Sequence, residues 1–169
     1  SHPVEIYGID ATGGSLHGLG PLPSVGAIAS LSNLELVSRI LERLCRVLDE
    51  PPTGHVRAVL LIDGFAAFRE AAASSAVPAP WDLPFAEILS RGRAAGVHVI
   101  LTADRPGAIP AAFAASLQRR FVLRLVRESH SALLGLSADA MTGAPPGRGS
   151  IAGPQAEFQS ASPAPPAGN

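Results

Sequence analysis

Continuous apolar runs are spaced along the chain and predict buried strands. Three of them, at residues 58–62, 97–102 and 121–126, are typical of strands that are buried on both faces, as in parallel sheets. Residues 4–9 read as a shorter strand that ends at Asp10. The chain is therefore expected to build most of its core around a sheet.

Amphipathic stretches separate these runs and predict helices. Ser32 is expected to begin one helix, because Glu35 follows three residues later and completes a capping box. Apolar residues then recur at helical spacing until Asp49, and charged residues take the opposite face. This segment is expected to cover one face of the sheet.

A second helix is predicted from Asp82 to Ala95, with Asp82 as its N-cap and Gly96 as its stop. Shorter helical segments are predicted at residues 65–73, 111–117 and 129–136. Since strands alternate with helices, the fold class is α/β with a mostly parallel sheet and flanking helices.

The 169 residues suit one domain, which we assign to residues 1–159. Short terminal strands are expected at Ile151 and at residues 156–158, around a Gly-Pro turn. Residues 160–169 form a Pro/Ala/Ser tail that is predicted to be disordered. The chain begins with Ser1 and enters a strand almost at once, so we expect a fragment of a longer protein.

Composition narrows the function classes. The net charge of -1 argues against a wholly basic nucleic-acid surface. All 13 basic residues are arginines, so any chemistry that needs a lysine is excluded. The single cysteine, Cys45, provides no disulfide framework, and the five histidines have no metal-ligand spacing.

Asp63 is the sharpest candidate for chemistry. It ends the apolar run at residues 58–62, and the carboxyl ends of parallel strands border the crevice where α/β proteins bind ligands. One interpretation is a carboxylate that orients magnesium through water, because magnesium keeps much of its hydration shell. The alternative is an aspartate that caps the turn after the strand.

Other side chains favour local interpretations. The Gly13–Gly14 pair could form a phosphate-binding nest, but no helix follows directly, which favours a loop. His98 begins a predicted buried strand and is expected to be a core histidine. For Trp81, packing and partner contact are equally compatible with the sequence.

Several segments resemble the FtsK/SpoIIIE family. The segments are residues 93–106 (RAAGVHVILTADRP), 119–125 (RRFVLRL) and 146–151 (PGRGSI). They are similar in order and spacing to the family's R-A-x-G-[IV]-H and A-T-Q-R-P run, its T-R-[IV]-x-F-R-V strand and its closing G-R-G.

Earlier segments of the chain resemble the EccC ATPases of type VII secretion more closely. Residues 7–16 (YGIDATGGSL) are similar to their Y-x-[IL]-D-F-G-G-G-x-L segment. Residues 22–26 (LPSVG) and 62–65 (IDGF) are similar to L-P-H-V-G and V-D-G-W. The resemblance covers residues 4–159 and implies a RecA-like, additional-strand P-loop ATPase core.

The resemblance implies roles for individual residues. Asp63 matches the Walker B aspartate, which orients Mg²⁺ through water. Asp104 takes the position of the sensor glutamine. Arg120 and Arg124 match positions where an arginine reaches the nucleotide of a neighbouring subunit. The sequence slightly favours a structural ion pair or exposure for both arginines.

The sequence also departs from the family's pattern. The phosphate-binding loop G-x-x-x-x-G-K-[ST] is absent, and the chain has no lysine to complete one. The strand that bears this loop would be missing from the sheet. Gly64 stands where hydrolytic members place a glutamate, and the carboxylate of Asp104 would repel a γ-phosphate. We therefore expect no tight ATP binding and no activity by this chain alone.

The leading hypothesis is a truncated, degenerate ATPase module of an EccC-like translocase that moves small helical WXG-type proteins across a membrane. The resemblance implies ATP and Mg²⁺ in the intact parent, neighbouring modules in a hexamer-like assembly, and a cytoplasmic position in a membrane-anchored protein. The alternatives are an FtsK-type DNA translocase, which the near-neutral charge disfavours, and a noncatalytic interaction or regulatory module.

Overall fold

The computed structural model describes residues 3–51, 55–74, 81–105, 107–123, 143–152 and 156–161. The chain divides into two compact units, Ser1–Ser116 and Leu117–Asn169.

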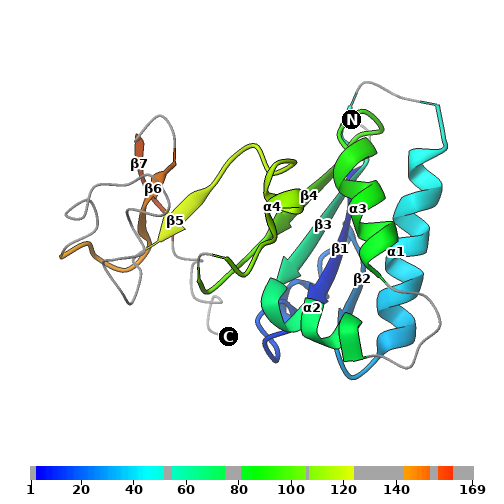
Figure 1. The fold of residues 1–169 in the computed structure, drawn as a ribbon, viewed down its shortest axis with the longest axis horizontal. Coiled ribbons are helices and arrows are strands. Elements are labelled where there is room, and N and C mark those ends of the chain that lie inside the picture. The colour runs from blue at the N-terminus through cyan, green and yellow to red at the C-terminus, as the bar shows by residue number, and fades with distance from the viewer. Residues whose placement is uncertain are drawn as a thin grey trace, which may run out of the picture. The chain divides into compact units, whose positions relative to one another are not determined.

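The first unit contains a four-stranded parallel sheet (Figure 1). Its strands are β1 (Glu5–Asp10), β2 (Val25–Ser30), β3 (Ala58–Asp63) and β4 (Val97–Leu101), in the order β2-β1-β3-β4. The register places Asp10 beside Asp63. The α/β class and the parallel sheet predicted from the sequence are confirmed.

Helices pack on one face of this sheet. They are α1 (Leu34–Leu48), α2 (Phe65–Ser74), α3 (Asp82–Arg91) and the short α4 (Ala111–Ala114), with a 3₁₀ turn η1 at His17–Leu19. Figure 1 shows α1 and α3 side by side against the sheet. The core forms where Ile9, Leu60 and Ile62 meet Ile40 and Leu44 of α1.

An aromatic cluster fills the space under α2 and α3. Its members are Phe65, Phe68, Trp81, Phe85 and Phe113, with neighbouring ring centroids 5.3–6.2 Å apart. Trp81 is 2% exposed, stacks on Phe68 and donates from Nε1 to the Ser38 hydroxyl over 2.9 Å. Trp81 therefore packs locally within this unit.

The expectation of strands buried on both faces is wrong. Ala58, Leu60 and Ile62 are buried in β3, but the alternating residues Val59 and Leu61 are only half-buried. The described helices cover one face only, so the residues of β3 and β4 that point the other way are partly or largely exposed.

The same uncovered face corrects the assignment of His98 to the core. His98 is exposed, and Ile100 beside it on β4 is 59% exposed. Strand β4 also pairs only with β3 among the residues that the structure describes, which leaves its other edge open in this part of the chain.

Helix α1 begins one residue later than the capping box predicts. The N-cap is Asn33, whose side-chain oxygen accepts from the Leu36 amide over 3.1 Å. Asn33 replaces Ser32 because the Ser32 hydroxyl bonds instead to Ser30 at 2.6 Å. Glu35 lies in the first turn and pairs with Arg39.

Helix α3 is shorter than predicted. Asp82 is its first residue rather than its N-cap, and the helix ends at Arg91 instead of Ala95. The chain turns here toward β4, and the Val97 amide donates to the Gly92 carbonyl over 2.7 Å. A Cβ at Gly92 would lie 2.9 Å from the Val97 carbonyl oxygen, so this close turn requires glycine. Helix α4 is likewise shorter than the predicted 111–117 segment.

The second unit contains an antiparallel sheet of β5 (Phe121–Leu123), β6 (Arg148–Ile151) and β7 (Ala156–Gln159), in that order. The terminal strands are as predicted, whereas the third parallel, buried strand is not. Phe121 and Leu123 are 57% and 52% exposed, because β5 pairs with a hairpin strand rather than entering the parallel sheet. The predicted helix at residues 129–136 and most of the tail lie outside the described residues.

No helix in the described part of the chain is long and apolar enough to cross a lipid bilayer.

We predict that Phe68→Ala lowers the free energy of unfolding by about 3–5 kcal/mol, because it empties the centre of the aromatic cluster. Leu83→Ala is the matched control, since Leu83 on α3 is 73% exposed, and its effect should stay within about 0.5 kcal/mol. Urea denaturation measures both, and similar losses for the two variants would contradict the packing described.

Candidate functional site

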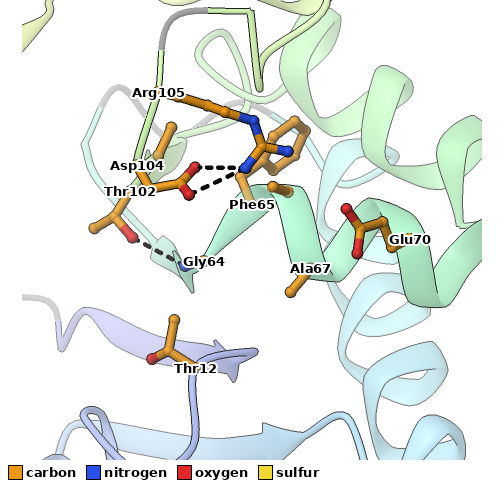
Figure 2. A pocket seen from close by; sticks show the side chains of 10 residues that line it. Thr12, Gly64, Phe65, Ala67, Glu70, Thr102, Asp104 and Arg105 are labelled. Carbon is orange, nitrogen blue, oxygen red and sulfur yellow. Dashed lines mark hydrogen bonds and ion pairs between the residues drawn. The ribbon is translucent and has the colours of Figure 1, made fainter. Parts of the chain in front are cut away.

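Polar side chains gather where the parallel strands end. β1 ends at Asp10, β3 ends at Asp63, and Thr102 directly follows β4. A pocket of about 360 Å³ opens beside them and is lined by Thr12, the start of α2 and residues 102–105 (Figure 2). This edge is the place where α/β sheets bind ligands.

Three hydroxyl groups donate to the carboxylate of Asp63. Thr12 and Ser15 both donate to Oδ2, the latter over 2.5 Å, and Thr102 donates to Oδ1 over 2.6 Å. The hydroxyls of Ser15, Thr102 and Thr12, in that order of effect, lower the pKa of Asp63. Asp63 therefore carries a negative charge that is already solvated by protein hydroxyls.

Asp10 differs from Asp63 because it is buried and its carboxylate binds the backbone of the loop that follows it. Its carboxylate accepts from the backbone amides of Gly13 and Leu16 over 2.9 Å, of Gly14 over 3.1 Å and of Thr12 over 3.2 Å. The residue is only 2% exposed. The nest of amides considered for a phosphate thus encloses a carboxylate of the chain itself.

Two opposing effects act on Asp10. Burial would raise its pKa, but the amides of Leu16, Gly14, Gly13 and Thr12 together lower the pKa from 3.8 to about 2. The glycines make this wrapping feasible, because Gly13 and Gly14 have φ values of 104° and 128°. The loop after β1 is therefore fixed by the charge at its root.

The loop after β1 also restricts which residue can occupy position 64. Its φ is +82°, and a Cβ there would lie 2.6 Å from Cγ2 of Thr12. Its amide donates to the Thr102 hydroxyl over 2.9 Å, a bond drawn in Figure 2. Any larger residue at this position, glutamate included, would strain the backbone and push Thr12 away.

Asp104 and Arg105 form the far wall of the pocket. Both side chains are exposed, and the Arg105 guanidinium reaches the two Asp104 oxygens over 3.1 and 3.3 Å (Figure 2). Asp104 thus lines the same pocket as Thr102, and its charge is countered by its neighbour. Its sensor role stays a prediction.

The structure does not test the role of the candidate arginines. Arg120 is exposed just before β5 in the second unit, where its carbonyl accepts from the Ala152 amide, and Arg124 lies outside the described residues. Their intersubunit role stays a prediction. Arg148 pairs with Glu157 across the β6–β7 hairpin over 2.9 Å.

Sequence reasoning missed the hydroxyl residues Thr12, Ser15 and Thr102. A signal was present, since Thr12 and Ser15 closely follow the predicted strand that ends at Asp10, and Thr102 is the last residue of the predicted strand at 97–102. Within the described residues, no group of three His, Cys, Asp or Glu side chains forms a cluster that could hold a metal ion. Any cation here would depend on Asp63 and on neutral oxygens.

We predict that Asp10→Asn destabilises the chain in a pH-dependent way. The pKa of Asp10 is lower in the folded chain, so its carboxylate stabilises the fold above pH 3.8, and this contribution is lost as pH falls toward 2. The loss in the variant should be about 2 kcal/mol at pH 7 and should shrink below pH 4. Urea denaturation across this range measures it, with Asp82→Asn as a control at a half-exposed carboxylate. A difference that is constant with pH would contradict it.

We also predict that Gly64→Ala costs at least about 1 kcal/mol more than Gly107→Ala. Both glycines have positive φ, but a Cβ at Gly107 meets nothing within 4 Å. Gly107→Ala therefore measures the cost of backbone strain alone, and the difference between the variants measures the contact with Thr12. Adding Thr12→Ser should reduce the difference, because it removes the methyl that the new Cβ meets. Equal costs in chemical denaturation would show that Thr12 does not contact position 64.

Comparison with known proteins points to one group. The sequence matches no protein-family model. It is 29% identical over 170 residues to the ESX-3 secretion system protein EccC3 of Mycobacterium tuberculosis, covering 88% of this chain and 13% of EccC3. The chain thus corresponds to a small part of that relative.

Solved structures with the same fold include two of EccC from Thermomonospora curvata. One contains ATPases 2 and 3 in complex with a signal sequence peptide (TM-score 0.73, 19% identity, 90% of this chain and 31% of that one). The other is the cytoplasmic domain of this type VII secretion ATPase (0.72, 20%, 88% and 20%). A third is the pCW3 conjugation coupling protein TcpA in its monomer form with ATPγS (0.61, 16%, 92% and 51%).

In both sequence and fold, the chain therefore resembles the FtsK/SpoIIIE-type ATPase modules of the EccC proteins of type VII secretion.

Proposed function

We propose that the chain is the later part of an ATPase module in an EccC-like type VII secretion translocase. The observation that carries the proposal is the position of Asp63, at the end of β3 and hydrogen-bonded to Thr102 at the end of the neighbouring β4. In a module of this type, these two strands bear the Walker B aspartate and the sensor residue.

The donor set suits magnesium. Asp63, Thr12, Ser15 and Thr102 present only oxygen atoms, which hard divalent cations prefer. Bound Mg²⁺ would neutralise charge on the β- and γ-phosphates of ATP. Asp63 would hold the hydrated ion through water, and Thr102 would keep that carboxylate oriented.

This chain would provide only part of a binding site for the phosphates of ATP. The chain has no lysine, so a phosphate-binding loop with its lysine must come from another segment of the same protein. The structure offers that segment a place, because β4 pairs on one side only among the described strands and the sheet face with Ile100 is uncovered. Parallel sheets are normally covered on both faces.

We further propose that the completed module binds nucleotide but hydrolyses it poorly. Gly64 provides no carboxylate to polarise water, and its contact with Thr12 leaves no room for one. Asp104 near the γ-phosphate position would weaken binding unless Arg105 keeps it paired. Such a module would act by nucleotide-dependent changes in its contacts with neighbouring modules.

The proposed partners follow from the relatives. TcpA contains ATPγS in its structure, which supports ATP as the nucleotide, and an EccC structure contains a signal sequence peptide, which supports secreted proteins with such a segment as cargo. We place the module on the cytoplasmic side of a membrane-anchored parent, as in the related cytoplasmic domain of EccC. A hexamer-like assembly and WXG-type cargo are part of the proposal.

A noncatalytic regulatory module is the second candidate, and the fixed Gly64 favours it. In that case the completed protein would bind no nucleotide.

One experiment separates the two candidates. We predict that this chain alone shows no micromolar binding of a fluorescent ATP analogue with Mg²⁺, whereas the protein extended by its upstream segment binds it. Asp63→Asn should weaken that binding at least about tenfold, while Asp82→Asn at the half-exposed first residue of α3 should leave it unchanged. Fluorescence anisotropy measures both, and an extended protein without nucleotide binding would leave only the regulatory role.

A further inference from the structure

Two side chains of the loop after β1 form hydrogen bonds with one carboxylate oxygen of Asp63. A carboxylate offers about four acceptor positions, two on each oxygen. Thr12 and Ser15 both donate to Oδ2, whereas only Thr102 donates to Oδ1. Oδ2 is therefore fully used, and one position on Oδ1 remains.

The hydroxyls of Thr12 and Ser15 lie on a loop, whereas that of Thr102 lies at the end of a strand. Thr102 follows β4 and also accepts from the Gly64 amide, so it is part of the sheet edge. Thr12 and Ser15 are exposed residues on the loop, and their hydroxyls lie 3.4 Å from each other. They approach Asp63 from the solvent side.

The loop is held in this position at two points. Its root is fixed by the amides that surround the buried Asp10 carboxylate, and the Ala11 amide donates to the Asp63 carbonyl over 2.9 Å. At its other side, the Thr12 methyl fills the space beside Gly64. The backbone can therefore remain in place while the side chains of Thr12 and Ser15 rotate about their Cα–Cβ bonds and take the hydroxyls away from Asp63. In Thr12 this rotation also moves the methyl group, which meets no Cβ at Gly64.

We propose that Thr12 and Ser15 form a hydroxyl latch that covers Oδ2 of Asp63, so that a hydrated divalent cation gains this oxygen only when the latch releases it. The inference rests on the proposed function of Asp63. It adds that access to the metal position is controlled from the β1 loop, by side chains that themselves need not bind the nucleotide.

The test measures metal access without activity. Mn²⁺ replaces Mg²⁺ as a paramagnetic probe, and the broadening of the Gly64 amide signal is followed by NMR in the ¹⁵N-labelled chain. The latch-free variant is Thr12→Val with Ser15→Ala. We expect it to reach half-broadening at roughly one-tenth of the Mn²⁺ concentration that the unaltered chain needs, the factor of a hydrogen bond to a charged group.

Controls isolate the hydroxyls. Thr12→Ser retains the hydroxyl and should behave like the unaltered chain, and Ser90→Ala removes a hydroxyl that bonds only within α3. Asp63→Asn in the latch-free background should abolish the gain. If the double variant fails to fold by circular dichroism, Ser15→Ala alone frees one position on Oδ2 and should give a smaller gain.

The outcomes separate the latch from the proposed function. Equal midpoints with and without the hydroxyls, both lost in Asp63→Asn, reject the latch and leave the metal position at Asp63 intact. Broadening that is absent from the latch-free variant, or independent of Asp63, also rejects the latch. The nucleotide experiment on the extended protein then decides the ATPase assignment separately.

Discussion

The site depends on a buried negative charge that the chain satisfies with its own backbone. An ionised carboxylate taken out of water is costly unless hydrogen bonds replace its hydration. At Asp10 four amides of the following loop do so, and they can converge only because two successive glycines adopt positive φ. The position of Thr12 and Ser15 and the room at Gly64 follow from this arrangement.

The α/β class with a parallel sheet could be predicted from the hydrophobic pattern, because Leu60 and Ile62 lie in a short continuous apolar run that is typical of a core strand. The motif resemblance added the order of elements and the position of Asp63. Helix boundaries were less accurate, since the choice between Ser32 and Asn33 depends on a side-chain hydrogen bond to Ser30 that no local pattern shows.

Side-chain exposure was predicted least well. His98 and Phe121 lie in apolar runs, yet both meet solvent among the described residues. An apolar run shows that a strand can be covered, but what covers it belongs to the tertiary structure. The three hydroxyls around Asp63 were missed for a similar reason, because Thr12 and Thr102 are 90 positions apart and only the parallel register joins them.

Among the described residues, one sheet face and one edge of β4 have no covering element, so the stability of the first unit can depend on what binds there. A segment that binds over Ile100 and along that edge binds the folded state and not the unfolded one, so it raises the free energy of unfolding by mass action. At a hundredfold excess over its dissociation constant, such a partner adds about 2.7 kcal/mol. Thermal stability of this chain would then report on assembly, and a cell's quality-control proteases would remove copies that fail to find their neighbours.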